Sequence, residues 1–330
     1  MSDAAGNHRE TSDSRKARAA AWAADRLGLE SIPLEPVSGD ASFRRYFRTA
    51  AGRTSLILMD APPDQEDSRP FLDVAARLRE AGLKAPEILH FDLSLGFGLI
   101  EDFGDTLYRE LISPESIDDL VPDLFGALEG MAHRVQTRGL PAYDEERLQE
   151  EMDLFRDWYL DRHRGRPLRA DEEAAWQTSC DSLIDSARRQ PQVFVHKDFH
   201  SCNLLRTPQG PGIIDFQDGL VGPLSYDFVS LVWDRYIAWP RPRLEQWMGD
   251  MHRRLRPGCP AAEWVRCCDL MGLQRNLKIV GIFARLHYRD GKAGYLELIP
   301  RFYDYLLDVL PRYPEFRDLQ RLLETPECAP

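Results

Sequence analysis

Residues 193–226 read VFVHKDFHSCNLLRTPQGPGIIDFQDGLVGPLSY, and the order of apolar and polar residues in this stretch decides the fold. The first three residues, VFV, are apolar and rich in β-branched side chains, which is typical of a buried strand. The pattern H-x-D-x-x-x-x-N follows at once and contains Asp198 and Asn203. A second apolar run, G-I-I, ends in Asp215. The stretch therefore predicts two strands, each followed by an aspartate, with an asparagine on the connection between them.

Two aspartates and an asparagine in this arrangement suit phosphoryl transfer, because that reaction depends on positioning and on neutralisation of charge. We predict that Asp198 is the base that meets an acceptor hydroxyl, and that Asn203 and Asp215 bind Mg²⁺. Carboxylate and amide oxygens are hard ligands of the kind that Mg²⁺ prefers. The alternative is that each of the three residues only caps a turn.

Other catalytic motifs are missing or incomplete. His196 and His200 are four residues apart, but the Glu of a zinc-binding H-E-x-x-H helix is absent and the segment begins on a strand. We expect His196 to support the loop through hydrogen bonds, and His200 to lie near an acceptor pocket or at the surface. The sequence contains no Walker A motif, no G-x-G-x-x-G after a strand and no G-x-S-x-G. These absences argue against a P-loop NTPase, a Rossmann dehydrogenase and a serine hydrolase.

The composition is that of an acidic globular protein. The 330 residues carry a net charge of −12, and the pI is near 5.2. Binding to nucleic acid or to an anionic membrane needs basic surface, so neither is expected. No apolar run approaches the roughly 20 residues of a membrane span, and the polar N-terminus lacks the apolar core of a signal peptide. Six scattered cysteines without a CxxC pair predict reduced thiols in a cytoplasmic protein.

The pattern of elements changes near residue 102. Residues 1–13 are polar and are expected to be a disordered tail. Residues 14–102 predict a lobe with a mostly antiparallel sheet, in which strands at 43–48, 55–60, 86–91 and 97–100 accompany helices at 14–27 and 68–81. Residues 103–330 predict a larger lobe with helices at 120–139, 145–164, 170–188, 226–239, 243–255, 261–286 and 295–310. The predicted class is α+β, with a nucleotide-binding lobe followed by a catalytic and acceptor-binding lobe.

A short segment before the second predicted strand has the composition of a phosphate loop. Its residues are small and polar: Ser38, Gly39, Asp40, Ala41 and Ser42. Without bulky side chains, backbone N–H groups approach a phosphate closely. An ordinary hairpin turn is the alternative interpretation of this segment.

The motifs HKDFHSCN, IIDFQ and GPLSYD resemble those of the aminoglycoside phosphotransferase/choline kinase-like group, which shares the protein-kinase fold. A narrower resemblance covers residues 34–303. The strings VSGDASFRRYFR, LILMDAPPDQED, LIEDFGD and LQRNLKIVGIFARLHYRDGK are similar to those of the anomeric N-acetylmuramate/N-acetylglucosamine kinases of bacterial cell-wall recycling.

The resemblance implies an ATP- and Mg²⁺-dependent kinase that phosphorylates the anomeric hydroxyl of an amino sugar. The sugar 1-phosphate would pass to a nucleotidyltransferase, which implies a link in a pathway. By position, Asp198 would be the base and residues 38–42 would cover the phosphates. Glu101, Asp102 and Phe103 would form the hinge that binds adenine, mainly through backbone groups.

One position departs from the wider kinase pattern. The third strand of kinases carries a Lys that holds the α- and β-phosphates. Here the matching run is Leu-Ile-Leu-Met, so that Met59 stands in the place of the Lys. We expect an arginine of the preceding strand, Arg44, to supply the missing charge.

A basic and polar cluster is predicted on the helix at 261–286, formed by Arg275, Asn276, Lys278 and Arg285. The resemblance suggests that it holds the lactyl carboxylate of N-acetylmuramate, and a solvated helix face is the alternative. His200 and Gln217 are further candidates for contact with the substrate. Trp233, Tyr236 and Trp239 would stack on a sugar ring or pack in the core.

Two other functions stay open at this point. The same fold also serves kinases of aminoglycosides, choline and homoserine, although cationic acceptors call for an acidic pocket. Met59 also suggests a pseudokinase that binds nucleotide without turnover. The joint presence of Asp198, Asn203 and Asp215 argues against a pseudokinase, because a pure binding protein needs no base.

Overall fold

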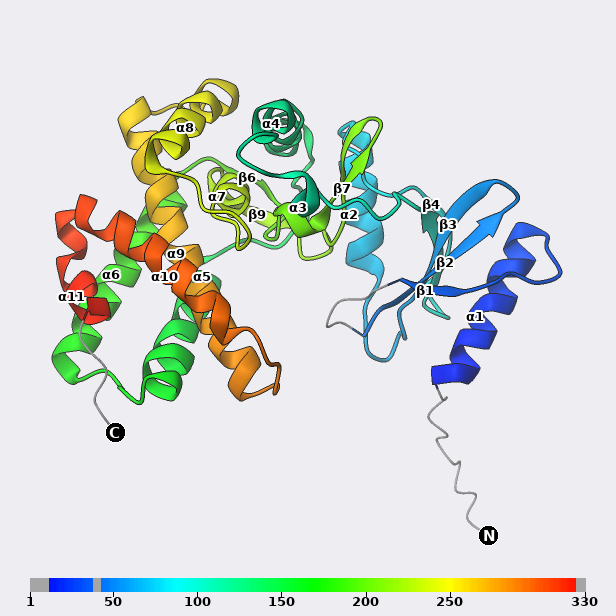
Figure 1. The fold of residues 1–330 in the computed structure, drawn as a ribbon, viewed down its shortest axis with the longest axis horizontal. Coiled ribbons are helices and arrows are strands. Elements are labelled where there is room, and N and C mark those ends of the chain that lie inside the picture. The colour runs from blue at the N-terminus through cyan, green and yellow to red at the C-terminus, as the bar shows by residue number, and fades with distance from the viewer. Residues whose placement is uncertain (1–11, 38–42, 325–330) are drawn as a thin grey trace, which may run out of the picture.

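The computed structural model describes residues 12–37 and 43–324 and shows a small sheet-containing lobe joined to a larger helical lobe (Figure 1). The small lobe contains a five-stranded antiparallel sheet in the order β1-β2-β3-β5-β4. Its strands are β1 (Glu35–Val37), β2 (Arg45–Ala51), β3 (Thr54–Asp60), β4 (Ile88–Asp92) and β5 (Phe97–Glu101). The four predicted strands are confirmed. The short β1 strand was not predicted, because Pro36 interrupts its sequence signal.

Helices cover both faces of this sheet. On one face, α1 (Ser12–Leu27) packs its small side chains against Phe47, Leu58 and Leu99. On the other face, α2 (Arg69–Glu80) belongs to the main core. A strand that is buried on both faces reads as a continuous apolar run. This arrangement explains the unbroken LILM sequence of β3, all four residues of which are buried.

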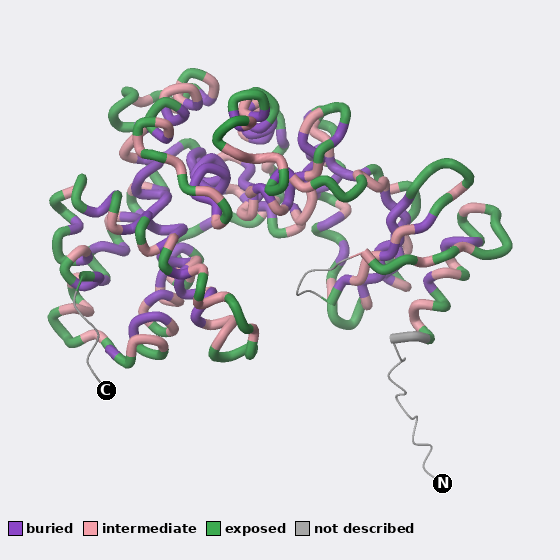
Figure 2. Tube along the Cα trace, in the orientation of Figure 1, coloured by how far each residue is buried: buried purple, intermediate pink, exposed green. Residues whose placement is uncertain are grey.

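The large lobe is built around α9 (Ala261–Tyr288), which is buried along most of its length (Figure 2). Helices α5, α6, α7, α8 and α10 all pack against it. The other helices are α3 (Tyr108–Leu111), α4 (Ile117–Arg134), α5 (Glu145–Leu154), α6 (Ala170–Arg189), α7 (Tyr226–Val232), α8 (Arg241–Leu255), α10 (Ile299–Val309) and α11 (Arg317–Glu324). Three-residue 3₁₀ turns occur at Ser201–Asn203, Leu296–Leu298, Leu310–Arg312 and Pro314–Phe316. In the described parts of the chain, no helix is long and apolar enough to cross a membrane.

Three helix predictions need correction. The helix expected over 145–164 ends as an α-helix at Leu154 and continues as a π-helix, Phe155–His163. Gly281 of α9 packs against this junction. A Cβ atom added to Gly281 would lie 2.3 Å from the carbonyl carbon of Leu154. The change from α-helix to π-helix thus occurs where the two helices pack very closely. Helix α4 ends at Arg134 and does not reach residue 139.

The third correction concerns the segment after α7. This helix ends at Val232, whereas the periodicity predicted a helix up to residue 239. Trp233 leaves the helical conformation and lies against Gly272 of α9, where an added Cβ would be 2.3 Å from its ring. Burial of this large ring thus takes precedence over local helix propensity. The chain after Trp233 is no longer helical, and Arg235 in this segment is part of the cleft lining.

The stretch at 193–226 forms two small two-stranded sheets. Strand β6 (Gln192–Val195) pairs antiparallel with β9 (Leu220–Pro223). Strand β7 (Leu204–Thr207) and strand β8 (Gly210–Ile213) form a hairpin between them in sequence. The two connections of this frame, β6 to β7 and β8 to β9, carry the predicted catalytic residues. In Figure 1 the hairpin lies between the small sheet and the bulk of the helical lobe.

The tail predicted at 1–13 lies outside the described residues, apart from the two residues that begin α1. The predicted phosphate loop at 38–42 also lies outside them.

Candidate active site

The loop after β6 is held in a strained conformation by a buried carboxylate. Lys197 has a positive φ of 76°, which is uncommon for a residue other than glycine. Asp227 of α7 accepts hydrogen bonds from the backbone N–H groups of His196, at 2.7 Å, and Lys197, at 3.1 Å. Burial raises the pKa of Asp227 to about 6. The residue belongs to the GPLSYD string, but its hydrogen bonds to the loop are not evident from that string.

His196 links the two halves of the site. Its side chain is fully buried, and its Nε2 atom lies 3.0 Å from the carbonyl oxygen of Ile214. Its Nδ1 atom accepts a hydrogen bond from the N–H group of Asp198 at 3.3 Å. These two contacts define a tautomer with the proton on Nε2. The expectation that His196 supports the loop through hydrogen bonds is confirmed.

Asn203 connects Asp198 to Asp215 through hydrogen bonds. The Asn203 Nδ2 atom donates to the backbone oxygen of Asp198 at 3.0 Å and to Asp215 Oδ2 at 3.3 Å. Gln217 Nε2 donates to the second carboxylate oxygen, Asp215 Oδ1, at 2.9 Å. Asp215 has a positive φ of 62°. The loops thus bring Asp198, Asn203 and Asp215 together, as the motif predicts, and Gln217 joins them through Asp215.

The donor set of this cluster fits a magnesium ion. The structure gives Asp215 no ion pair with a described Lys, Arg or His side chain, so its charge is met only by the amides of Asn203 and Gln217. Magnesium is typically bound by one or two protein oxygens together with substrate phosphates and water. The described residues contain no group of three His, Cys, Asp or Glu side chains that would hold a metal alone. Asp215 and Asn203 match a site in which the protein supplies only two of the ligands of the ion and phosphates and water supply the others.

Asp198 faces the cleft in a positively charged environment. Burial by itself would raise the pKa of its carboxyl group. The positive charges of Lys278, His200 and Arg275 outweigh this effect, and the pKa of Asp198 is lowered. The carboxylate therefore stays ionised at neutral pH, which is the state in which it accepts a proton.

A largely buried network of charged side chains connects the loop after β6 to α5 and α9. Glu151 of α5 lies 3.1 Å from the Nζ atoms of both Lys197 and Lys278. Lys278 also donates to the hydroxyl of Tyr226 at 3.0 Å, and Tyr143 donates to the other oxygen of Glu151. Burial opposes the charge on Lys278, but its neighbours, Glu151 first among them, raise its pKa. Glu151 thus ties the strained loop to α9 and holds a positive charge near Asp198.

The residues of the predicted cluster on α9 differ in burial. Arg275 and Asn276 are buried, and one guanidinium nitrogen and the amide oxygen have no hydrogen-bond partner among the described residues. Lys278 is buried as well, so the interpretation of these residues as a solvated helix face is wrong. Arg285 is half-buried, and burial together with Arg289 lowers its pKa. His200 also has an unpartnered buried atom, Nδ1.

The cleft between the lobes has a volume of about 990 Å³ and contains the predicted base, metal ligands and hinge. Its described lining includes Asp198, His200, Asn203, Asp215, Gln217, Glu101, Asp102 and Phe103. Asp102 accepts from Arg48 at 2.7 Å and from Ser55 at 2.5 Å, and Glu101 accepts from Lys84 at 2.5 Å. Both hinge carboxylates are therefore bound within the protein.

The two arginines near the start of β2 face different surroundings. Arg44 donates to Glu66 at 2.5 Å and lies 6.0 Å above the ring of Phe71. Burial raises the pKa of Tyr46, and the charges of Arg44 and Asp215 both act on its hydroxyl. Arg44 thus lies on the side of the cleft. Met59 itself is fully buried in the main core.

Arg45 points into a different cluster. It donates to the fully buried carboxylate of Asp60 at 2.5 Å, and Arg15 of α1 binds the same carboxylate at 2.7 Å. This arrangement places Arg45 on the α1 face of the sheet, away from the cleft.

Two of the three candidate stacking aromatics belong to the core. Trp233 is fully buried, and Trp239 packs edge-on against Trp247 with ring centres 5.0 Å apart. Tyr236 is 45% exposed. Core packing is therefore confirmed for the two tryptophans, and Tyr236 stays a candidate for contact with a ligand.

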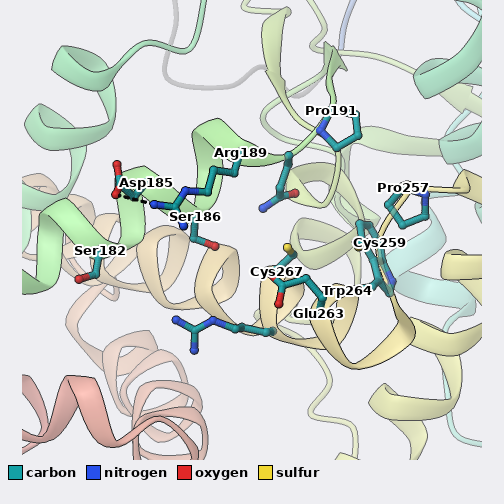
Figure 3. Close-up of a pocket in the computed structure, with 12 residues that line it drawn as sticks. Ser182, Asp185, Ser186, Arg189, Pro191, Pro257, Cys259, Glu263, Trp264 and Cys267 are labelled. Atoms are coloured by element: carbon teal, nitrogen blue, oxygen red, sulfur yellow. Dashed lines mark hydrogen bonds and ion pairs between the residues drawn. The ribbon is translucent and has the colours of Figure 1, made fainter.

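A second hollow lies on the large lobe between the end of α6 and the start of α9 (Figure 3) and has a volume of about 290 Å³. It shares no lining residue with the cleft. Burial raises the pKa of Cys267 to about 11 and also raises that of Cys259, so both thiols are protonated and unreactive at neutral pH. Asp185 and Arg189 at its edge pair with each other at 3.2 Å. This hollow offers no catalytic group among its described residues.

Comparisons with known proteins agree with this geometry. Residues 33–265 match the phosphotransferase enzyme family. The N-acetylmuramate/N-acetylglucosamine kinase of Pseudomonas aeruginosa is 45% identical over 296 residues, which cover 88% of this chain and 87% of that protein. The protein of the same name from Neisseria meningitidis serogroup B is 38% identical over 300 residues, which cover 87% of this chain and 88% of that protein.

Solved structures share the fold at much lower sequence identity. The choline kinase LicA from Streptococcus pneumoniae aligns with a TM-score of 0.60 at 12% identity, over 87% of this chain and 98% of that one. Aminoglycoside phosphotransferase APH(4)-Ia, in complex with ADP and hygromycin B, aligns with a TM-score of 0.59 at 16% identity, over 87% of this chain and 97% of that one. The predicted protein-kinase-like, two-lobe α+β fold is confirmed.

Proposed function

The chain belongs to the phosphotransferase enzyme family, and on this premise we propose that it transfers the γ-phosphate of ATP to the anomeric hydroxyl of N-acetylmuramate and N-acetylglucosamine. One observation carries the proposal: an ionised Asp198 lies beside the Asn203–Asp215 pair in a cleft large enough for two substrates. The names of the relatives that are 45% and 38% identical support the choice of amino sugars.

The chemistry assigns a separate task to each residue. The acceptor hydroxyl transfers its proton to the Asp198 carboxylate while its oxygen forms a bond to the γ-phosphorus, and the bond to the β-phosphate oxygen breaks to release ADP. Asp215 and Asn203 would hold Mg²⁺, which neutralises charge on the phosphates when bound. His196 and Asn203 keep Asp198 in position through the backbone of its loop.

The remaining residues are assigned by their position. We assign the nucleotide to the lobe at 14–102 and the acceptor to the lobe at 103–330. Because the hinge carboxylates of Glu101 and Asp102 are bound within the protein, adenine would contact backbone groups near Phe103. The residues proposed to contact uncharged groups of the sugar are His200, Gln217, Arg275 and Asn276. We propose that Lys278 acts through Asp198, whose pKa it lowers. Arg285 is not part of the described cleft lining, so we assign it no contact with the sugar.

The biological setting follows from the reaction. ATP is the phosphate donor, so we propose the cytoplasm as the compartment. A sugar 1-phosphate is the usual substrate of a nucleotidyltransferase, so we propose that such an enzyme consumes the product in the recycling of peptidoglycan. The two enzymes would share a metabolite and need no stable complex.

The proposal is tested by incubating the purified protein with Mg-ATP and a panel of sugars and amino alcohols, with the product followed by NMR. We expect phosphate on C1 of N-acetylmuramate and of N-acetylglucosamine. Phosphorylation of choline, homoserine or an aminoglycoside would replace the amino-sugar assignment. Binding of ATP without transfer to any acceptor would identify a pseudokinase.

The Arg44→Met variant is expected to raise the KM for ATP about tenfold, because a hydrogen bond to a charged group is worth roughly 1.5 kcal/mol. The matched variant Arg45→Met should leave this KM within about twofold, since Arg45 binds Asp60 on the other face of the sheet. It should instead lower the melting temperature, because the buried Asp60 loses one of its two arginines. Steady-state kinetics and thermal unfolding of both variants decide the matter. Equal changes in KM would exclude Arg44 as the substitute for the missing Lys.

A further inference from the structure

The cleft contains cationic side chains that the phosphotransfer reaction does not use. Four Lys or Arg residues are part of its described lining: Arg48, Arg109, Arg235 and Lys292. Arg48 is neutralised by Asp102 and Asp105, at 2.7 and 2.8 Å. Arg109 has only Glu110, at 3.8 Å, and Arg235 forms no ion pair with any described carboxylate. Two guanidinium groups thus face the cleft without a strong anionic partner.

Arg109 and Arg235 belong to one cluster. Both guanidinium groups lie over the ring of Tyr236, at 5.9 and 5.1 Å from its centre. Both also interact with the side chain of Cys202, which is located on the loop between Asp198 and Asn203. Because Cys202 lies between Asp198 and Asn203 in the chain and lines the same cleft, the cluster lies close to the proposed base, and Arg109 and Arg235 both belong to the lobe to which we assign the acceptor.

The protein holds Arg235 in place through its backbone. Arg301 of α10 donates to the carbonyl oxygen of Arg235 at 2.7 Å. The preceding residue, Asp234, is buried and accepts hydrogen bonds from the N–H and hydroxyl groups of Ser201 on the catalytic loop. Ser201 binds one oxygen of this carboxylate, and the other oxygen accepts a hydrogen bond from the backbone N–H group of Arg235 at 2.5 Å, so that Asp234 fixes the backbone and forms no ion pair with the Arg235 guanidinium. A fixed backbone, with a guanidinium that forms no ion pair with a described carboxylate, is the arrangement that binds an anionic ligand at low cost in entropy.

We propose that Arg235, assisted by Arg109, binds the carboxylate of the acceptor sugar. The inference rests on the proposed function, because N-acetylmuramate differs from N-acetylglucosamine by a lactyl ether that ends in a carboxylate. A planar guanidinium matches a carboxylate in a bidentate manner. Lys278 is unsuited to this role, since Glu151 already neutralises it at 3.1 Å. The arginine pair then determines the preference between the two sugars, and the phosphoryl-transfer residues are common to both.

The test is a comparison of both sugars with one set of variants. In Arg235→Met, kcat/KM for N-acetylmuramate should fall roughly 10- to 100-fold, through KM, because a charge-assisted contact is lost. Rates with N-acetylglucosamine should stay within about threefold, since this sugar has no carboxylate. Arg235→Lys should restore part of the preference. Arg109→Met should act in the same direction with a smaller effect, because Arg109 is the more exposed of the two.

Arg162 provides a matched control, since it lies over the ring of Tyr288 at 5.5 Å, outside the cleft lining. Arg162→Met should change neither sugar's kinetics. If Arg235→Met lowers kcat/KM equally for both sugars, or changes neither, the arginine pair does not read the carboxylate. If the unmodified protein phosphorylates neither sugar, the proposed function is wrong and this inference falls with it. The two failures are therefore distinguishable in one experiment.

Discussion

Asp198→Asn is expected to lower turnover about 10²- to 10⁴-fold, which is the usual contribution of a positioned general base. The amide has nearly the same shape as the carboxylate but accepts no proton. Affinity for ATP should stay within about threefold, because the proposed nucleotide contacts lie at residues 101–103 and on the small lobe. Single-turnover kinetics and nucleotide binding by calorimetry measure the two quantities separately.

The same substitution at Asp218 is the control, because this exposed carboxylate lines the same cleft without contacting Asp198. Asp218→Asn should retain turnover within about threefold.

The pH dependence of kcat adds an independent check on the proposed base. Lys278, His200 and Arg275 lower the pKa of Asp198, so the unmodified enzyme should show no loss of kcat assignable to this group between pH 8 and pH 5. An Asp198→Asn enzyme with normal turnover would remove Asp198 from its role.

The parts of the fold with strong local signals could be predicted from the sequence. Strand β3 is a continuous apolar run, and α2 has clear helical periodicity with Gly82 at a positive φ of 74° after its end. The grouping of Asp198, Asn203 and Asp215 was also predictable, because their motif places them on two short connections of one frame. In each case the information lies within about 20 neighbouring residues.

The rest depends on contacts between distant segments. The end of α7 at Val232 is determined by the packing of Trp233 against Gly272, and this ending brings Arg235 into the cleft. The π-helix occurs where α9 comes close to the backbone of Leu154. No periodicity or motif contains such information, so the place of Arg109 and Arg235 in the cleft lining was not predicted. For the same reason the burial of Arg275, Asn276 and Lys278 was not predicted.

Glu151 is the clearest case of a residue whose importance appears only in three dimensions. It lies within an ordinary polar helix sequence, DEERLQEEMD, yet it binds both Lys197 and Lys278 at 3.1 Å. Burial alone would raise the pKa of Glu151, but the charges of Lys278 and Lys197 outweigh burial and lower it. Among the described residues, both lysines form their ion pair with this single carboxylate, and one of them, Lys197, has the strained backbone of the loop after β6.

Glu151→Ala is therefore expected to reduce the free energy of unfolding by about 3–5 kcal/mol, because it removes the ion-pair partner of the buried Lys278 and of the partly buried Lys197. Glu150→Ala removes a neighbouring glutamate that is exposed, and it should change this free energy by less than about 0.5 kcal/mol. Urea unfolding of the unmodified protein and of the two variants measures these free energies.

The pH dependence of this difference follows from the lowered pKa of Glu151. A carboxyl group with a lowered pKa stabilises the folded protein above its unfolded pKa of about 4.3, and this stabilisation is lost as the pH falls through the folded pKa. The difference between the unmodified protein and Glu151→Ala should thus be as large at pH 5 as at pH 7. A loss no greater than that of Glu150→Ala would show that the lysines find other partners, and that Glu151 does not hold the catalytic loop.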